Sequence, residues 1–447
     1  MHSRFDPREL SDFARYYGFH YDSLDPMSLV TDVLIDMERG LDGRSSSLPM
    51  IPSYITPVSG VRPGKTVLAL DAGGTNLRVS RVRFDEASKA VAEGTQKHPM
   101  PGTKGRVGAD EFFDMIADAV LPVLGDAAGT GDAGDIGGIG FTFSYHMDIQ
   151  PDADGILLAF SKEIDAPEVI GKAIGAGLRQ ALARKGRAYD GPIVLLNDTA
   201  ATLLSGIAAI PGDGPVIGCI LGTGFNTAYP ETCIPKIGFE SRDAPQIVVC
   251  ETGTFNLRYR GLLDREFDDT TKTPGTYALE KATSGAYLGP LTLHILKRAV
   301  RDKVIHFAQS DEFLALPGLD TRTLSDFCRD PFAAEGPAGS PLGSLFGPGE
   351  TDAISSVQYI ASIVAERGAM FAAAVLAATV RRMQGDLPQA APIRIAMEGT
   401  TYMAYKGMRR SLDAWLHTLL VREMPRPYVV APVDQASLFG AAVAASG

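Results

Sequence analysis

The sequence LALDAGGTNLRV, residues 68–79, decides the fold class of this chain. An apolar run leads into Asp71 and a pair of glycines, and a second apolar run ends at Phe84. This order predicts a strand, a glycine turn and a second strand. Because Gly73 and Gly74 lack a Cβ atom, backbone N–H groups in the turn can approach an anion closely.

Polar side chains accompany this turn. Thr75 and Asn76 add hydrogen-bond donors, Arg78 adds a positive charge, and Asp71 could hold Mg²⁺ through water, as oxygen ligands do. The turn is no Walker A loop, since no Gly-Lys-Ser or Gly-Lys-Thr follows, and no dinucleotide fingerprint, since a strand pattern rather than a helix comes next. The pattern predicts a phosphate-binding turn, with a tight β-hairpin that merely requires a positive φ as the structural alternative.

A second unit of the same kind occupies residues 216–229 (VIGCILGTGFNTAY), with the turn Gly222-Thr223-Gly224. Repetition of the unit indicates two related lobes, and two such turns facing each other could clamp the phosphates of a nucleotide. A helix pattern at 170–182, in which apolar residues recur every four positions, separates the units together with a buried strand at 193–196. This alternation of strands and helices indicates an α/β fold.

Hydrophobic periodicity and glycine content predict the remaining elements. Helices are expected at 25–41, 111–124, 351–383 and 437–445, a strand at 139–143, and surface loops at 125–138 and 335–350.

Composition narrows the classes of function. A length of 447 residues predicts two or three domains, and a net charge of -11 without a basic block argues against nucleic acid or an anionic membrane as partner. The charged opening segment lacks the apolar run of a signal peptide, which predicts a cytoplasmic protein. The apolar stretch 371–380 is too short to span a bilayer, and four cysteines without CxxC spacing predict neither disulfides nor a zinc site.

The sequence Leu196-Asn197-Asp198-Thr199 follows a predicted buried strand and precedes a helix pattern. The carboxyl end of a strand is a favoured place for catalytic groups in α/β folds. A carboxylate there can accept the proton of an attacking hydroxyl group. The structural alternative is that Asp198 or Thr199 caps the helix, and position alone does not separate the two.

These motifs resemble, in order and spacing, those of the hexokinase family, whose members share an actin-like ATPase core. The matching segments are 37–41 (MERGL), 48–49 (LP), 68–79, 140–144 (GFTFS), 161–162 (SK), 197–199 (NDT), 222–226 (GTGFN), 250–255 (CETGTF), 264–268 (DREFD), 280–281 (EK), 287–289 (YLG), 398–400 (EGT) and 437–445. The resemblance implies an α/β, two-lobed actin-like ATPase (ribonuclease H-like) fold, with a small and a large domain around a sugar-binding cleft. The small domain would take 65–197 plus 434–447, and the large domain 1–64 plus 198–433.

The resemblance also implies a function: ATP-dependent phosphorylation of a hexose, with glucose as first candidate, at the 6-hydroxyl, as in the first step of glycolysis. Asp198 would be the general base, and Lys162 the second catalytic residue. Sugar hydroxyls would be bound by Ser144, Ser161, Lys162, Asn197, Asp198, Asn226, Glu251 and Glu280. Phosphate and adenosine contacts, with Mg²⁺ held through water by Asp71, would come from Asp71, Gly73, Gly74, Thr75, Asn76, Arg78, Thr223, Gly399, Thr400 and Ser437.

Several alternatives stay open from the sequence. The acceptor could be mannose, fructose or an N-acetylhexosamine, the chain could be a non-catalytic sugar sensor, and either a monomer or a homodimer is compatible with it. Taken singly, Glu251 and Glu280 could be solvated or ion-paired surface glutamates. Bacterial glucokinases of the repressor-related family fit less well, because their cysteine-rich zinc motif is missing.

The chain departs from the family pattern at four places. Glu398 stands where the family more often has aspartate, and the closing turn at 434–440 carries bulkier residues than usual. Tyr145-His146 stands where an aromatic residue and a proline are usual, and Ser161 replaces a threonine. His146 is expected to be a loop residue with local hydrogen bonds, with a role in sugar selectivity as the alternative.

Overall fold

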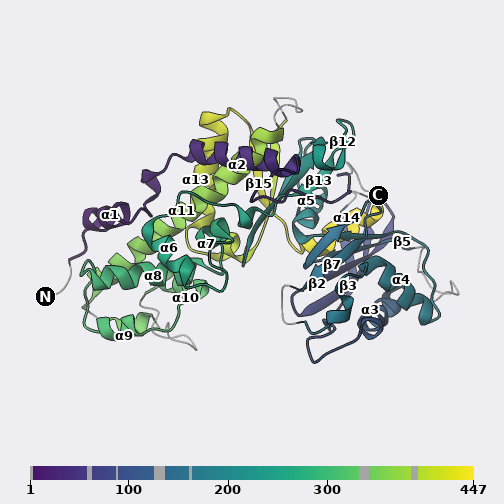
Figure 1. Cartoon of the computed structure of the whole chain (residues 1–447), viewed down its shortest axis with the longest axis horizontal. Helices are drawn as coiled ribbons and strands as arrows, with labels where there is room; N and C mark the ends of the chain where they lie inside the picture. Colours follow the sequence, from purple (N-terminus) through teal and green to yellow (C-terminus); the bar gives the residue numbers. More distant parts are fainter. Residues whose placement is uncertain are drawn as a thin grey trace.

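The computed structural model of the chain describes residues 4–57, 63–86, 89–124, 136–160, 164–331, 342–347, 349–383 and 391–447. Two lobes lie side by side, each built on a mixed β-sheet that helices cover (Figure 1). The two-lobed α/β architecture expected from the sequence is therefore confirmed.

The smaller lobe contains a five-stranded sheet in the order β4-β3-β2-β5-β8. Its strands are β2 (Thr66–Gly73), β3 (Asn76–Phe84), β4 (Ala90–Pro99), β5 (Ile136–Phe143) and β8 (Ile193–Leu196). The hairpin strands β2, β3 and β4 pair antiparallel, whereas β5 and β8 extend the sheet from β2 in parallel. Strand β2 is an almost unbroken apolar run because it is buried on both faces, one of them covered by helices α3 (Ala109–Leu124) and α4 (Ile174–Arg184).

The larger lobe repeats this arrangement. Its sheet has the order β1-β13-β10-β9-β14-β15, formed by β1 (Ile51–Pro52), β9 (Val216–Leu221), β10 (Phe225–Glu231), β13 (Gln246–Val249), β14 (Ile393–Glu398) and β15 (Tyr428–Pro432). From β13 to β15 the strand order and directions match those of the smaller sheet: an antiparallel set of three, then two parallel strands. The two related lobes predicted from the repeated strand-turn-strand unit are therefore present.

Two helices lie between the sheets: α5 (Asp198–Ala209) and α14 (Ala436–Ser446) (Figure 1). Helix α14 packs on β2 and β5, α5 packs on β9 and β14, and the helices pack on each other. A Cβ atom at Gly440 would lie 2.0 Å from the carbonyl oxygen of Ala201, and one at Gly140 only 1.8 Å from that of Ala441. Glycine at these two positions therefore allows the close contact of α14 with α5 and with the small sheet.

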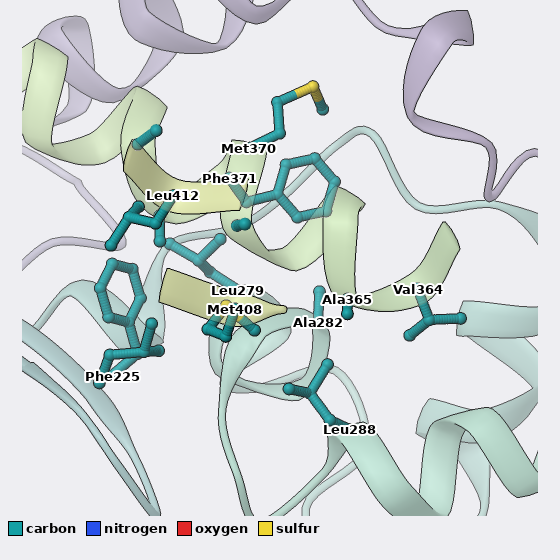
Figure 2. Close-up of a cluster of buried hydrophobic side chains, with 14 of the residues drawn as sticks. Phe225, Leu279, Ala282, Leu288, Val364, Ala365, Met370, Phe371, Met408 and Leu412 are labelled. Atoms are coloured by element: carbon teal, nitrogen blue, oxygen red, sulfur yellow. The ribbon is translucent and has the colours of Figure 1, made fainter. Parts of the chain in front are cut away.

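Helix α11 (Thr351–Met383) forms the centre of the larger lobe. Figure 2 shows Val364, Ala365, Met370 and Phe371 from this helix within a cluster of buried apolar side chains. By length and composition α11 is the one helix among the described residues that could cross a membrane, but 89% of its most apolar window is buried inside the protein. The apolar stretch 371–380 is thus part of a buried 33-residue helix, and the helix predicted at 351–383 is confirmed over its full length.

Further helices surround this core. They are α1 (Pro7–Tyr16), α2 (Pro26–Leu41), α6 (Leu262–Asp269), α7 (Ala278–Thr283), α8 (Leu288–Arg301), α9 (Ser310–Leu314), α10 (Thr321–Arg329), α12 (Thr400–Ala404), α13 (Met408–Leu416) and the π-helical segment His417–Glu423. Two short hairpins, β6 (His146–Ile149) with β7 (Gly155–Ala159) and β11 (Cys233–Ile234) with β12 (Phe239–Glu240), complete the sheets.

Some predicted boundaries are wrong. Ile170 is exposed and precedes α4, which begins at Ile174, because Gly171 has a φ of +81° that no helix accommodates. Strand β5 begins at Ile136 rather than 139. Of the loop predicted at 335–350, the described part contains a 3-10 helix at Gly343–Leu345, next to the buried Leu342.

Candidate active site

A cavity of about 640 Å³ opens between the two lobes. It is lined by six of the eight side chains predicted to bind sugar: Ser144, Asn197, Asp198, Asn226, Glu251 and Glu280. The first comes from the end of β5, the next two from the start of α5, and the others from β10, the end of β13 and α7. The other two, Ser161 and Lys162, lie outside the described residues.

Asp198 is the first residue of α5 and is separated from the end of strand β8 by Asn197 alone. The helix is capped by Asn197, whose Oδ1 accepts a hydrogen bond of 2.7 Å from the backbone N–H of Thr199. The alternative that Asp198 or Thr199 is the N-cap is therefore wrong. The carboxylate of Asp198 instead accepts a bond of 3.2 Å from the Thr199 hydroxyl, at a helix N-terminus that favours its negative charge.

Asn226 holds Glu251 in place at the cavity wall. The Asn226 Nδ2 donates to Glu251 Oε1 over 2.8 Å, and its Oδ1 accepts from the N–H groups of Thr227 and Thr252. Because each amide atom has a fixed partner, the assignment of oxygen and nitrogen in this side chain follows from the network. Glu251 itself has a φ of +55°, a conformation that is uncommon for a residue with a side chain and that strains the backbone at this site.

Glu280 reaches the cavity across two glycines. Its Oε2 accepts a 3.2 Å hydrogen bond from the N–H of Phe225, and a Cβ atom at Gly224 or Gly253 would lie within 2.8 Å of that oxygen. Neither glycine could be replaced without moving the carboxylate. The alternative reading of Glu251 and Glu280 as surface glutamates is wrong, because both are half-buried and line the cavity.

Burial sets the electrostatics of these two carboxyl groups. It raises the pKa of Glu251 to about 7, an effect that Asn226 opposes and that the negative charges of Asp198 and Glu280 increase. Burial also raises the pKa of Glu280, against the hydrogen bond from Phe225 and the charge of Lys281. The wall of the cavity therefore gathers acidic groups that are unfavourably desolvated without a ligand.

We expect Glu251→Gln to weaken the pH dependence of stability of the unliganded protein. The folded-state pKa of about 7 lies above the ordinary value of 4.5, so between these values the folded protein binds more protons than the unfolded chain. The free energy of unfolding must then fall as the pH rises through 7. For this group the fall from pH 6 to pH 8 is on the order of 1 kcal/mol.

Urea titrations at pH 6 and pH 8 measure this difference for both proteins. Glu312→Gln, at an exposed position on α9, is the matched control and should retain the wild-type slope. An equal pH dependence of stability in wild type and Glu251→Gln would contradict the raised pKa of Glu251.

The first glycine turn is a tight β-hairpin, as expected in the structural alternative to a phosphate-binding turn. Gly73 pairs with Asn76, so Gly74 and Thr75 form a two-residue connection, and Gly74 has a φ of +70°. Arg78 Nη1 lies 3.3 Å from Asp71 Oδ2, and the Asn76 amide lies 3.3 Å from the Thr75 hydroxyl. The hairpin thus brings a carboxylate, a guanidinium and several donors to one edge, and a phosphate-binding role remains a prediction.

The second turn is packed against the segment that follows β14. The Thr401 hydroxyl donates to the carbonyl of Gly222 over 2.7 Å, and a Cβ atom at Gly399 would lie 2.4 Å from the backbone of Leu221. Thr223 and Thr400 are both exposed and each directly follows a residue of this contact, Gly222 or Gly399. Ser437 lies elsewhere, on α14, where its carbonyl accepts a bond from the Thr142 hydroxyl.

Glu398 is a site residue that sequence reasoning treated only as a departure from a pattern. Its Oε2 accepts a 3.0 Å bond from Thr202 on α5, and burial raises its pKa to about 7, with further contributions from the charges of Asp198 and Asp71. It therefore lies close enough to Asp198 and to Asp71, which precedes the first turn, for their charges to act on it. Its place at the carboxyl end of the parallel strand β14 is the signal that could have identified it.

His146 also departs from the family pattern, and the structure describes its position. It lies on strand β6, not in a loop, and it lines the cavity together with Met147, Ile149 and the exposed Leu158. The prediction of a loop residue is wrong. A role in sugar selectivity stays a prediction.

Comparisons with known proteins agree with this geometry. Two hexokinase family models match residues 12–208 and 216–446. The chain is 30% identical over 449 residues to Hexokinase-5 of Oryza sativa subsp. japonica, covering 93% of this chain and 85% of the relative. It is 27% identical over 435 residues to Hexokinase-2 of Candida albicans, covering 94% and 88%.

Solved structures show the same fold. A hexokinase from Schistosoma mansoni complexed with glucose superimposes with a TM-score of 0.73 at 24% identity, over 99% of this chain and 100% of the other. A ROK hexokinase from Thermus thermophilus shares the fold more distantly, with a TM-score of 0.51 at 18% identity, over 85% and 97%. With the two family models together covering nearly the whole length, this chain belongs to the hexokinase family.

Proposed function

We propose that this protein transfers the γ-phosphoryl group of MgATP to the 6-hydroxyl of a hexose, with glucose as first candidate. As a member of the hexokinase family it is a sugar kinase. The observation that carries the proposal is the cavity, where Asp198 shares one wall with Asn226, Glu251 and Glu280. Such a wall suits a ligand with several adjacent hydroxyl groups, because carboxylates and amides can each accept or donate to them.

Asp198 acts as the general base in this proposal. Phosphoryl transfer requires mainly that the reactants are positioned and that charge is stabilised, while a base orients the nucleophile and accepts its proton. Asn197 supplies the helix cap, so the Asp198 carboxylate is not required to hold the first turn of α5. The carboxylate can therefore face a hydroxyl of the sugar without loss of the helix start.

Glu251 and Glu280 recognise the sugar by hydrogen bonds. Each uses one oxygen within the protein, on Asn226 and on Phe225, and has a second carboxylate oxygen that can accept from a ligand hydroxyl. A site built of buried acceptors rejects ligands that leave those acceptors unpaired. Ser144 and Asn197 would add neutral contacts, and Ser161 and Lys162 are proposed to join from the segment after β7.

The residues of the first turn fit a phosphate group and Mg²⁺. Magnesium is commonly held by one or two carboxylates together with waters and substrate phosphates, and Asp71 offers one such carboxylate beside the donors of Thr75 and Asn76. When bound, the ion neutralises charge on the phosphates. We place Thr223, Gly399 and Thr400 on the nucleotide as well, with Gly73, Gly74, Arg78 and Ser437 completing the set.

We further propose a small domain of 65–197 plus 434–447 that closes on a large domain of 1–64 plus 198–433. Closure over the sugar would exclude water, which otherwise competes as acceptor. Small-angle scattering should give a smaller radius of gyration with saturating glucose than without it. Superimposable curves would remove closure from the proposal.

A cytoplasmic location is part of the proposal. All four cysteines, Cys219, Cys233, Cys250 and Cys328, are free thiols, and free thiols in this number are typical of a reducing compartment.

A coupled assay of ADP release tests the function. Glucose, mannose, fructose and N-acetylglucosamine serve as acceptors, and 6-deoxyglucose, which lacks the accepting hydroxyl, is the matched control. We expect turnover with at least glucose and none with 6-deoxyglucose. Turnover confined to another hexose would change the acceptor, and binding of glucose without any ADP release would indicate a sugar sensor instead.

A further inference from the structure

The hydroxyl group of Tyr145 connects the sugar side of the site to the first glycine turn. Tyr145 follows Ser144 at the end of β5, its side chain is buried, and its hydroxyl donates a 2.7 Å hydrogen bond to the carbonyl oxygen of Gly74. The neighbouring N–H of Ser144 donates to the carbonyl of Ala72 over 3.1 Å. Two consecutive residues of the sugar-side segment are thus bonded to the β2–β3 hairpin.

The ring of Tyr145 is held firmly. Its centroid lies 4.8 Å from that of Phe143 and 5.2 Å from that of Phe160, the latter in an edge-to-face arrangement. Burial, and to a lesser degree the charge of Asp71, raises the pKa of the phenol to about 12, so the group keeps its proton and remains a donor at neutral pH. A fixed ring and a permanent donor together fix the position of the Gly74 carbonyl.

The bonded carbonyl belongs to the central peptide of the turn. Gly73 and Asn76 are paired, so the peptide between Gly74 and Thr75 is the one that can rotate between two turn types. Gly74 has a positive φ and Thr75 does not, which matches a type II′ turn. Because a trans peptide is planar, its C=O and N–H groups point in opposite directions, so the Tyr145 bond also sets the direction of the Thr75 N–H.

We propose that Tyr145 is a positioning residue for phosphoryl transfer: its hydroxyl holds the Gly74–Thr75 peptide in the orientation that presents the Thr75 N–H to the phosphates of the nucleotide. The inference rests on the proposed function, since it requires nucleotide phosphates at this turn. It makes the oxygen of Tyr145, and not only its ring, part of the link between sugar-side and nucleotide-side segments.

Tyr145→Phe tests the inference, because it keeps the ring and removes only the hydroxyl. Loss of one hydrogen bond corresponds to a change of about 3–10-fold in an equilibrium constant. We expect KM for MgATP, and the dissociation constant of MgADP measured by calorimetry, to rise by about this factor. KM for the sugar should stay within about twofold, because none of the hydrogen bonds of Asn226, Glu251 and Glu280 is altered.

Tyr189→Phe is the matched control. Its hydroxyl also donates to a backbone carbonyl in the smaller lobe, that of Pro192 at 3.4 Å, but it lines no part of the cavity. Both KM values should remain at the wild-type level in this variant. An unchanged KM for MgATP in Tyr145→Phe, with an active wild type, would overturn the inference alone, whereas a wild type that releases no ADP with any sugar would overturn the proposed function.

A double substitution separates orientation of the peptide from general loss of packing. Thr75 resists rotation of the peptide by itself, because a β-branched residue is strongly disfavoured at positive φ. In a Thr75→Gly background that resistance is absent, so removal of the Tyr145 hydroxyl should raise KM for MgATP by a larger factor than it does alone. Equal factors in both backgrounds would contradict control of the peptide by Tyr145.

Discussion

Replacing Asp198 by alanine is expected to lower turnover by at least ~100-fold while sugar binding remains measurable. A positioned general base contributes about this factor or more, and Asp198 is the one carboxylate at the start of α5 among the described residues that line the cavity. Asn226, Glu251 and Glu280 keep their own hydrogen bonds in the variant, so the sugar still meets most of its partners. Steady-state ADP release gives the turnover, and intrinsic fluorescence or calorimetry gives the affinity for sugar.

Two further variants show whether the loss is one of chemistry. Asp198→Asn keeps the acceptor for the Thr199 hydroxyl and removes the charge, so it should lose about as much turnover as the alanine variant. Asp320→Asn alters a carboxylate at the N-terminus of α10, outside the cavity, and should remain fully active. Near-normal turnover in Asp198→Asn would mean that another group accepts the proton.

Local patterns predicted much of the fold. The two glycine hairpins, the helices at 25–41 and 351–383 and the final helix were all anticipated, because each is encoded by turn residues or by a period of 3.6 within its own segment. The prediction that Ile170 begins a helix is wrong for the opposite reason. It matched the helical period, but the backbone of Gly171 has a conformation that spacing of apolar residues cannot reveal.

Only the site residues that belong to sequence motifs could be predicted from the sequence. Six predicted sugar-binding side chains line one cavity, although their segments are up to about 140 positions apart in the chain. Glu398 and the hydroxyl of Tyr145 were not assigned roles, because their meaning depends on Thr202 and on Gly74, which meet them only in the folded protein. Contacts between segments that are far apart in the chain cannot be predicted from the spacing of residues.

The largest expected loss of stability follows from removal of Arg367, at the centre of the larger lobe. Its guanidinium is fully buried on α11 and donates two bonds, of 2.7 and 2.6 Å, to the carboxylate of Asp264 on α6. Asp264 is itself only 5% exposed and also accepts from the N–H of Gly261 at the start of α6. Removing one partner of a buried, bidentate pair leaves an uncompensated charge, so Arg367→Met should lower the free energy of unfolding by about 3–5 kcal/mol.

A second substitution shows whether the uncompensated charge is the cause of this loss. Asp264→Asn removes the charge but keeps an oxygen for the Gly261 N–H. Adding it to Arg367→Met should therefore restore part of the stability, because the double variant no longer buries an unpaired carboxylate. Arg83→Met breaks an exposed pair with Glu93 and is the matched control, for which a loss below about 1 kcal/mol is expected. Urea unfolding of the four proteins measures these differences. If the double variant is less stable than Arg367→Met, then the Asp264 carboxylate still stabilises the lobe without its partner, through its bond to the Gly261 N–H, and the uncompensated charge is not the cause of the loss.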